Sequence, residues 1–423
     1  MLDIKFIREN KELIALAAKK KRVNFNVEDL LTLDDQRREL QTVVEGKRAE
    51  QKKKGEQMTN MIRDDRRVPL VEELRTLKSG LEEEEKKLKE ILQKWQALML
   101  QTPNIPDISV PDGESEKNNK EVRVVGERPH FSFTPKNHLE LMEHCDMADF
   151  IRGGEVAGFR GYFLKNEGAL LAFALWQFAL AHFTKKGFTP FIVPSLVRRQ
   201  TLLGTGYLPQ GEEDLYKTQD GDYLAGTAEV ASMAYFADTV IPQKDLPKKL
   251  IAFSPCFRRE AGSYGRDAKG LFRVHEFFKL EQIVLCEASH ETSVRLHEEL
   301  TTNAEELLNL LGLPYHVVIN CGGDLGLGQV KKYDIECFVP SEGKYRETHS
   351  SSYFHDFQTR RLNIRYKDSE GKMRFAHSLN NTALATPRIL IPLIEHNQQE
   401  DGSIIIPEVL RPFTGFDHIA PKK

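Results

Sequence analysis

A repeat of apolar residues between Leu70 and Leu98 constrains the fold of this chain more than any other feature. Its members fall alternately four and three positions apart over four heptads, and Glu84 takes the one position that is not apolar. This spacing is typical of a helix that buries one narrow stripe against a partner helix. The stripe consists of Leu70, Leu74, Leu77, Leu81, Glu84, Leu88, Ile91, Trp95 and Leu98.

The preceding segment is predicted to supply the partner helix. It carries a weaker version of the same pattern, and Pro69 lies between the two halves, where a proline favours the start of a helix. We therefore expect a helical head over residues 1–26 and then an antiparallel two-helix coiled-coil arm, each helix on the order of 50 Å long. The weaker pattern consists of Leu33, Leu40, Val44, Met58 and Ile62.

Charged runs on the two halves support this arrangement. Folding back places a basic run that includes Lys47, Arg48, Lys52, Lys53 and Lys54 roughly opposite the acidic run 82–85. We favour pairing between the two helices over direct contact of these residues with RNA. Two helices that share one seam expose most of their surface. An arm of this kind typically extends from a protein to contact a partner. The alternative is a rod through which two copies of the chain dimerise.

The remainder of the chain divides into a linker and a second domain, so the predicted parts are 1–101, 102–129 and 130–423. Residues 102–129 are rich in proline and charge, with one short strand at Val122–Val125. Strands and helices do not alternate regularly after residue 130, which predicts an antiparallel sheet in an α+β domain. The predicted helices are Leu139–Ile151, Ala169–Lys185, Glu291–Leu311 and Ile389–Ile394; the predicted strands are Phe191–Val197, Tyr315–Asn320, Ile335–Val339 and Phe357–Tyr366.

Composition excludes several classes of protein. A formal net charge of -3 argues against a generally basic nucleic-acid coat, so any contact with RNA should be local. The five cysteines form no CxxC pair, as expected of a reduced, cytoplasmic protein without a structural zinc. The longest apolar stretch, Leu170–Phe183, is interrupted by Gln177 and His182 and is too short to span a bilayer.

The segment Ser254–Leu285 is predicted to form two strands joined by a long loop rich in glycine, serine and arginine. Side chains alternate between the faces of a strand, so Arg258 and Glu260 share a side of the first strand. One face of the second strand carries Arg273, His275, Phe277, Lys279 and Glu281. Such a face either meets water or binds an anionic, planar ligand such as a nucleotide.

A glycine-rich run at Gly322–Gly328 invites comparison with dinucleotide-binding motifs. Its spacing is not GxGxxG, and the residues that follow do not open a convincing apolar helix. We therefore reject a dinucleotide site there. The sequence also lacks a P-loop, an HExxH motif and a GxSxG motif.

Motifs spread over nearly the whole chain resemble those of the class II aminoacyl-tRNA synthetases, and among them the seryl-tRNA synthetases of bacterial type. The ordered set is specific, and the fused N-terminal arm separates the seryl enzymes from other class II members. The motifs lie at Met1–Asn10, Gly204–Pro209, Thr227–Glu229, Cys256–Asp267, Asp356–Arg361 and Pro407–Pro412.

This resemblance implies an activity, cofactors and partners. The family activates L-serine with ATP to seryl-adenylate and pyrophosphate, then transfers serine to tRNA(Ser), and to tRNA(Sec) where it is present. Mg²⁺ assists, and carboxylate, hydroxyl and phosphate oxygens suit this ion. The expected state is a homodimer formed through Gly187–Val197, with the arms gripping the long variable arm of the tRNA. Arg63, Arg66, Arg67 and Arg75 are candidates for contact with the RNA backbone.

The resemblance also assigns residues to roles. Arg258 and Arg388 are the expected catalytic residues, since a guanidinium fork suits a phosphate. Glu347 and Ser350 are the expected metal ligands. The expected ATP-binding set is Arg258, Arg259, Glu260, Arg273, Val274, Phe277, Glu347, Thr348, His349, Ser350 and Arg388.

The expected serine-binding set is Thr227, Ala228, Glu229, Glu281 and Thr382. A buried carboxylate that accepts the serine hydroxyl can reject alanine by roughly 10⁴-fold, because alanine would leave it unpaired. Two segments, His349–Tyr353 and Asn380–Ala383, depart from the pattern of many relatives. Two other functions remain open: a paralogue that delivers an activated amino acid to an acceptor other than tRNA, and a coiled-coil scaffold with a degenerate nucleotide fold.

Overall fold

The computed structural model spans residues 1–423 and describes all of them except 61–66, 263–264, 266, 268 and 423. The chain forms two compact units. The helical unit consists of Leu2–Lys19 and Val23–Pro103, and the sheet unit consists of Met1, Lys20–Arg22 and Asn104–Lys423. Within the described residues, no helix combines the length and the apolar character needed to cross a membrane.

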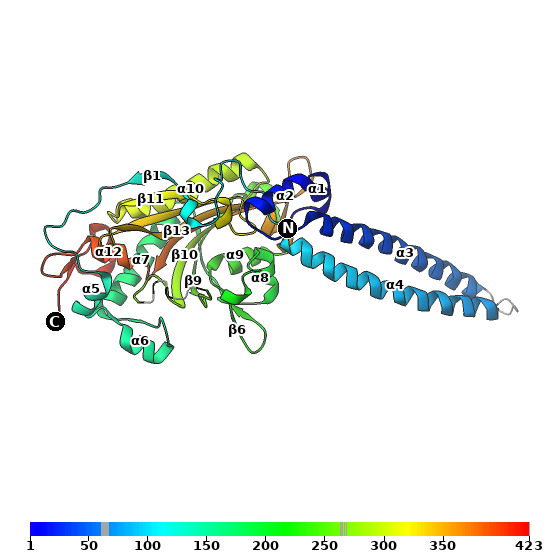
Figure 1. Cartoon of the computed structure of the whole chain (residues 1–423), viewed down its shortest axis with the longest axis horizontal. Coiled ribbons are helices and arrows are strands. Elements are labelled where there is room, and N and C mark those ends of the chain that lie inside the picture. Colours follow the sequence, from blue (N-terminus) through cyan, green and yellow to red (C-terminus); the bar gives the residue numbers. More distant parts are fainter. Residues whose placement is uncertain (61–66, 263–264, 266, 268, 423) are drawn as a thin grey trace. The chain divides into compact units, whose positions relative to one another are not determined.

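The helical unit contains two short helices, α1 (Ile4–Glu9) and α2 (Lys11–Lys20), and two long ones, α3 (Val27–Asn60) and α4 (Arg67–Gln101). The long helices lie side by side (Figure 1). Every predicted stripe position of α4 is buried or half-buried, including Glu84, while the residues between them are mostly exposed. The predicted two-helix arm is therefore confirmed.

The seam of α3 is partly polar, which explains its weak apolar pattern. Lys47 Nζ lies 3.6 Å from a Glu84 carboxylate oxygen and donates to the Gly80 carbonyl at 3.1 Å. Arg48 pairs with Glu85 at 2.7 Å, as predicted, whereas Lys54 pairs with Glu73 at 3.0 Å rather than with the acidic run. These pairs show that α3 and α4 are antiparallel. The predicted residues Ile62, Arg63 and Arg66 lie outside the described residues, as does the side chain of Arg67.

An eight-stranded sheet forms the centre of the sheet unit, in the order β1-β11-β12-β13-β16-β10-β9-β4. All neighbours are antiparallel except β4 and β9, which are parallel. The predicted antiparallel α+β fold is thus confirmed. The strands are β1 (Lys120–Val125), β4 (Thr189–Ile192), β9 (Lys248–Phe257), β10 (Glu276–Cys286), β11 (Tyr315–Ile319), β12 (Lys331–Val339), β13 (Lys344–His355) and β16 (His377–Thr386).

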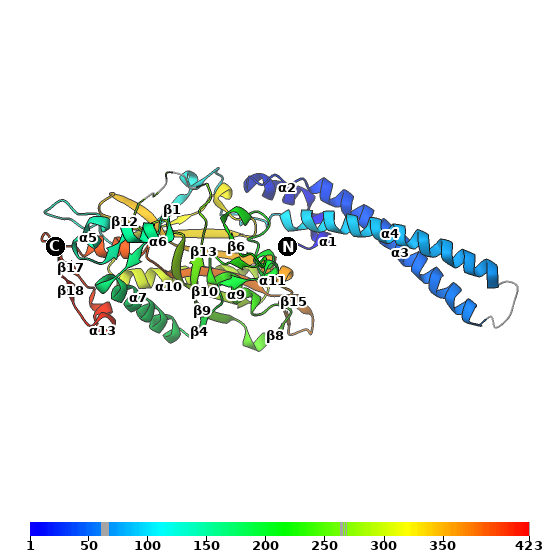
Figure 2. The same ribbon diagram turned by 90° about the horizontal axis from the view of Figure 1, so that it is seen from below.

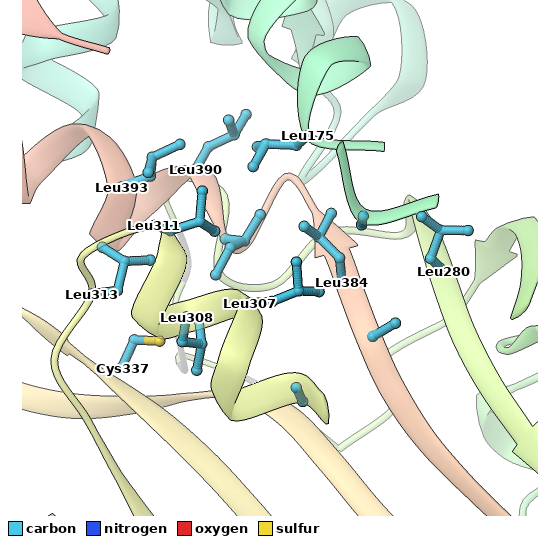
Figure 3. Close-up of a cluster of buried hydrophobic side chains, with 14 of the residues drawn as sticks. Leu175, Leu280, Leu307, Leu308, Leu311, Leu313, Cys337, Leu384, Leu390 and Leu393 are labelled. Atoms are coloured by element: carbon cyan, nitrogen blue, oxygen red, sulfur yellow. The ribbon is translucent and has the colours of Figure 1, made fainter. Parts of the chain in front are cut away.

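One face of this sheet packs on α7 (Asn166–Lys185), α10 (His290–Leu310) and α12 (Leu390–His396). Figure 3 shows Leu175 of α7, Leu308 of α10 and Leu390 of α12 gathered with sheet residues such as Leu384. Along β10, Leu280 belongs to this core. Alternation along the strand directs the next side chain, Glu281, to the opposite face, which is free to carry a site.

Smaller elements surround the sheet, and several can be followed in Figure 2. The helices are α5 (His138–His144), α6 (Phe150–Ala157), α8 (Arg199–Thr205), α9 (Ala228–Ala234), α11 (Phe357–Leu362) and α13 (Arg411–Thr414). The strands are β2 (Ala148–Asp149), β3 (Phe163–Leu164), β5 (Leu196–Val197), β6 (Tyr216–Lys217), β7 (Tyr223–Leu224), β8 (Val240–Pro242), β14 (Arg365–Lys367), β15 (Met373–Phe375), β17 (Ile404–Ile405) and β18 (His418–Ile419).

Three predicted elements differ from the structure. The predicted helix Leu139–Ile151 is wrong as one element, because α5 ends before Asp146, whose φ is 55°, and α6 starts after the capping residue Asp149. The predicted strand Phe357–Tyr366 is instead α11 followed by β14, and Asn363, at φ 54°, ends the helix. The predicted strand Phe191–Val197 is broken into β4 and β5 around Pro194, which has no N–H to donate.

Candidate active site

A cavity of about 370 Å³ lies on the face of the sheet opposite the core. The hairpin of β9 and β10, the segment before α9, strand β13 and strand β16 all contribute to its walls. These four parts of the chain, which carry the predicted site residues, therefore meet in one place. The predicted residues that line it are Thr227, Glu229, Arg258, Glu260, Arg273, Val274, Phe277, Glu281, Glu347, Thr348, Ser350, Thr382 and Arg388.

Three predicted residues are not among those that line the cavity. Ala228 packs in a small apolar cluster at the start of α9. Arg259 is exposed, and its backbone N–H donates to the Asp214 carbonyl at 2.9 Å. The His349 side chain is buried 2.8 Å from the Thr348 hydroxyl, and burial lowers its pKa to about 4.

His275 also departs from the predicted strand face. Because β10 begins at Glu276, the alternation along the strand does not extend back to His275. It lines a separate hollow that also involves Phe253 and Phe278. Its Nδ1 lies 2.9 Å from the Arg258 carbonyl, a contact that continues the hairpin beyond the strand ends.

Three guanidinium groups concentrate positive charge in one part of the cavity. The Arg258 guanidinium lies 5.2 Å from the Phe277 ring centroid and donates to the Gly226 carbonyl at 3.3 Å. Arg388 donates to the Phe272 and Glu347 carbonyls, each at 3.1 Å. Arg273 forms an ion pair with Glu260. Such a cluster is suited to a ligand that carries several negative charges.

The electrostatics of Glu347 keep it ionised at neutral pH. Burial opposes its negative charge, but the nearby Arg388 and Lys332 outweigh this effect, and the pKa of Glu347 lies below its ordinary value. Conversely, burial and the neighbouring Arg258 and Arg273 lower the pKa of Arg388. The guanidinium groups therefore repel one another, and the negative charge of a polyanion would reduce this repulsion.

Glu347 and Ser350 offer a carboxylate and a hydroxyl oxygen to the cavity from the same strand, β13. Among the residues the structure describes, no cluster of three histidine, cysteine or acidic side chains is arranged to hold a metal ion. Mg²⁺ commonly takes one or two protein oxygens and completes its shell with phosphates and water. The donors present fit that mode.

A buried carboxylate, Glu281, marks another part of the cavity. It is 3% exposed, accepts a hydrogen bond from the Thr227 hydroxyl at 2.6 Å and forms an ion pair with Lys279. Thr382 is its partner across the pairing of β10 with β16. Glu281 and Thr382 together make a small polar site in the cavity wall.

A second buried carboxylate, Glu229, lies close to the first. It accepts hydrogen bonds from the Tyr207 hydroxyl at 2.8 Å and from Gln358 Nε2 at 2.5 Å. Ser378 in turn donates to Gln358 Oε1 at 2.7 Å. Burial, and then the negative charge of Glu281, raise the pKa of Glu229 to about 7.

Sequence reasoning missed several residues of this site. Lys279 lay on the predicted strand face but received no role, and Tyr207 lies inside the Gly204–Pro209 motif. Asn380 lines the cavity from β16. Gln358 lies inside the Asp356–Arg361 motif, but it acts from α11, which was predicted as a strand, so the sequence did not place its amide beside Glu229.

Comparison with known proteins identifies the family. A model of the seryl-tRNA synthetase N-terminal domain matches residues 1–106, and a model of the class II tRNA synthetase core domain (G, H, P, S and T) matches residues 216–397. The chain is 45% identical over 422 residues to the serine–tRNA ligase of Deinococcus radiodurans, covering 98% of each chain. The chain belongs to the seryl-tRNA synthetase family.

Other members of the family agree. The serine–tRNA ligase of Thermodesulfovibrio yellowstonii is 42% identical, over 99% of this chain and 100% of its own. The crystal structure of seryl-tRNA synthetase from Pyrococcus horikoshii complexed with ATP is 38% identical and superposes with a TM-score of 0.90 over 100% of both chains. The predicted family, fold class and enzyme class, a serine–tRNA ligase, are confirmed.

A more distant structure shares the fold alone. Giardia lamblia prolyl-tRNA synthetase in complex with prolyl-adenylate is 16% identical, with a TM-score of 0.57 over 64% of this chain and 54% of its own.

Proposed function

We propose that this chain activates L-serine with ATP and then transfers serine to tRNA(Ser). One observation carries the proposal: a single cavity contains both a cluster of three arginines and the buried pair Glu281 and Thr382. The arginines suit a triphosphate, and the buried pair suits a small hydroxyl group.

In the activation step, a carboxylate oxygen of serine attacks the α-phosphorus of ATP, and the bond from that phosphorus to the pyrophosphate oxygen breaks. The reaction needs alignment and charge stabilisation more than a protein nucleophile. Arg258 holds the α-phosphate and Arg388 the terminal phosphates. Phe277 stacks on adenine, and Glu260 lies beside it. Glu347 and Ser350 would hold Mg²⁺, and this ion would neutralise part of the phosphate charge.

Serine is selected by its two polar groups. The ammonium group lies near Thr227 and the Glu229 carboxylate, while the hydroxyl donates to Glu281 and accepts from Thr382. Alanine and glycine leave Glu281 without this donor, at a cost in binding that follows from its burial. Threonine has the hydroxyl, so a lack of space for its extra methyl group must exclude it.

In the transfer step, a ribose hydroxyl at the 3′ end of the tRNA attacks the serine carbonyl carbon, and AMP leaves. The α3–α4 arm binds the tRNA, because a long helical pair can extend to a distant part of the tRNA without contributing to the cavity.

We further propose a homodimer formed around Gly187–Val197. In this region Ile192 is 88% exposed, and Leu196 and the nearby Tyr235 also face solvent. Such exposed apolar groups suit a protein interface.

Amino-acid-dependent exchange between ATP and pyrophosphate, measured with each of the twenty amino acids, tests the proposal, followed by charging of total tRNA. We expect exchange with serine alone and charging of serine acceptors, tRNA(Sec) included where it is present. Exchange with a different amino acid overturns the proposed specificity. Exchange with serine but no charging favours a paralogue with another acceptor, and no exchange at all favours a scaffold.

A further inference from the structure

The glycine-rich run rejected as a dinucleotide motif forms part of the cavity wall. Four consecutive residues, Gly326, Leu327, Gly328 and Gln329, line the cavity. None of them was assigned a role from the sequence. None belongs to the arginine cluster or to the pair Glu281 and Thr382, which is proposed to bind the serine hydroxyl. Their contacts therefore need a separate explanation.

A buried lysine binds three of the four carbonyl groups of the loop Gly326–Gln329. Lys21 Nζ donates to the carbonyls of Gly326 at 3.0 Å, Leu327 at 2.8 Å and Gln329 at 2.5 Å. Lys21 is 3% exposed. An ammonium group has three N–H donors, so all three are used on one short stretch of backbone. A buried ammonium without such acceptors would be strongly destabilising.

Asn104 completes the arrangement. Its backbone N–H donates to the Leu327 carbonyl at 2.9 Å, and its side-chain amide donates to the Gly328 carbonyl at 2.9 Å. All four carbonyls of the loop therefore bond to Lys21 or Asn104, neither of which is among the cavity-lining residues. A trans peptide group directs its N–H away from its carbonyl. The loop thus turns its carbonyls away from the site.

The loop is connected to the serine-reading part of the cavity. Gln329 Nε2 donates to the Ser352 hydroxyl at 2.8 Å, and Ser352 is paired across β13 and β16 with Asn380. Asn380 is two residues from Thr382, on the same face of β16. The arginines, in contrast, bond to Gly226, Phe272 and Glu347 and not to this loop.

The close approach of Lys20 and Lys21 to the glycine-rich run also explains why residue 322 is a glycine. A Cβ atom at Gly322 would collide with the backbone oxygen of Lys20, so any other residue would push the loop away from Lys21. The separation that lets Lys21 reach three carbonyls is therefore built into the sequence of the glycine-rich run.

We propose that Lys21 is a positioning residue for serine: its ammonium fixes the peptide groups of Gly326–Gln329 and, through Gln329 and Ser352, the serine end of the cavity. The inference rests on the proposed function, because it names serine as the affected substrate. It requires that loss of Lys21 changes the binding of serine and not that of ATP.

The test is Lys21→Met, which keeps an unbranched side chain only one atom shorter but removes the three donors. In pyrophosphate exchange we expect the KM for serine to rise about tenfold and the KM for ATP to stay within about twofold. Lys20→Met is the matched control, since the neighbouring Lys20 contacts only the Asp112 carboxylate, at 3.6 Å, among its ion pairs. It should match the wild type in both constants.

Thermal unfolding of each variant shows whether the fold is retained. If Lys21→Met does not fold, Asn104→Ala decides, with an expected rise of about threefold in the KM for serine alone. An unchanged KM for serine in a folded variant, or equal rises in both constants, overturns the inference. A wild-type protein without serine-dependent exchange would instead refute the proposed function.

Discussion

Glu281 and Thr382 face each other across β10 and β16 at the one point where the register of these strands slips, between Leu280 and Glu281. The neighbouring pair, Leu280 and Leu384, lies in the core, so Ala383 is the extra residue on β16. This bulge brings a carboxylate and a hydroxyl to the same face of the sheet, where both line the cavity.

Replacing Glu281 by alanine should abolish most serine activation. The variant loses the acceptor for the serine hydroxyl and leaves the buried Lys279 without its ion-pair partner. We expect serine-dependent exchange to fall on the order of 1000-fold, with ATP binding within about twofold of the wild type by calorimetry. Glu276→Ala, an exposed position on the same strand, is the control. A Glu281→Ala enzyme that still separates serine from alanine would refute the assignment.

The KM for serine should depend on the protonation of Glu229. Its pKa is raised to about 7, so it loses its charge as the pH falls below 7, and the serine ammonium loses a partner. We expect the KM for serine to rise about tenfold per pH unit below 7. In Glu229→Gln the KM should be high and independent of pH. Since the hydrogen bond from Gln358 lowers this pKa, Gln358→Leu should move the midpoint to higher pH.

The same shift has a consequence for stability. The folded-state pKa of Glu229 lies above its ordinary value of 4.5, so the folded state holds a proton that the unfolded state releases. The contribution of this proton to the free energy of unfolding is fully present below pH 4.5 and is lost as the pH rises towards 7. Glu229→Gln should therefore flatten this part of the profile of stability against pH, measured by urea unfolding.

Arg388→Lys should impair activation although it retains the positive charge. A lysine cannot reproduce the paired hydrogen bonds of the guanidinium to the Phe272 and Glu347 carbonyls while also reaching a phosphate. We expect kcat/KM for ATP in pyrophosphate exchange to fall about 100-fold or more. Arg374→Lys, at an exposed residue paired with Asp368, should leave the rate unchanged. Equal rates for the two variants would exclude a phosphate role for Arg388.

Shortening the arm should separate the two steps of the reaction. A protein in which residues 45–85 are replaced by a short turn retains every residue that lines the cavity. We expect its pyrophosphate exchange to stay within about twofold of the wild type, while kcat/KM for tRNA charging falls more than about 100-fold, since phosphate contacts are lost. Undiminished charging would show that the arm does not bind tRNA.

An exchange of charges across the arm should distinguish pairing from RNA contact. Arg48 and Glu85 are 2.7 Å apart; Arg48 is exposed and Glu85 is half-buried near the surface. An exposed pair contributes less than about 1 kcal/mol, so Arg48→Glu alone should lower the melting temperature only slightly. The double variant Arg48→Glu with Glu85→Arg should restore it and charge tRNA like the wild type. Charging that stays impaired in the double variant would indicate that Arg48 contacts the RNA.

Local patterns predicted much of this molecule. The heptad stripe of α4 and the alternation from Phe277 to Glu281 depend only on helical and strand geometry, which neighbouring residues impose. The prediction failed where the element boundary was wrong, as at His275, which precedes β10 and faces another hollow. Phe357–Tyr366 failed similarly, because its apolar and β-branched residues match a strand while Asn363 divides it.

Other parts of the site depend on contacts between distant segments. Gln358 reaches Glu229 across 129 positions of sequence, and Lys21 reaches the Gly326 carbonyl across 305. The Asp356–Arg361 motif includes Gln358 but does not indicate what its side chain contacts, and Lys21 lies in none of the motifs. Glutamine and lysine are ordinary surface residues in most proteins. Only the fold shows that both are buried.

The ion pair between Arg273 and Glu260 means that the arginine cluster carries its own counter-ion. A phosphate that engages Arg273 exchanges one anion for another instead of neutralising a bare charge, so stray inorganic anions gain little by entering. Under the proposed function a nucleotide gains more, because its base also stacks on the Phe277 ring. The same ion pair thus disfavours the binding of small anions and favours a ligand that has a base as well as phosphates.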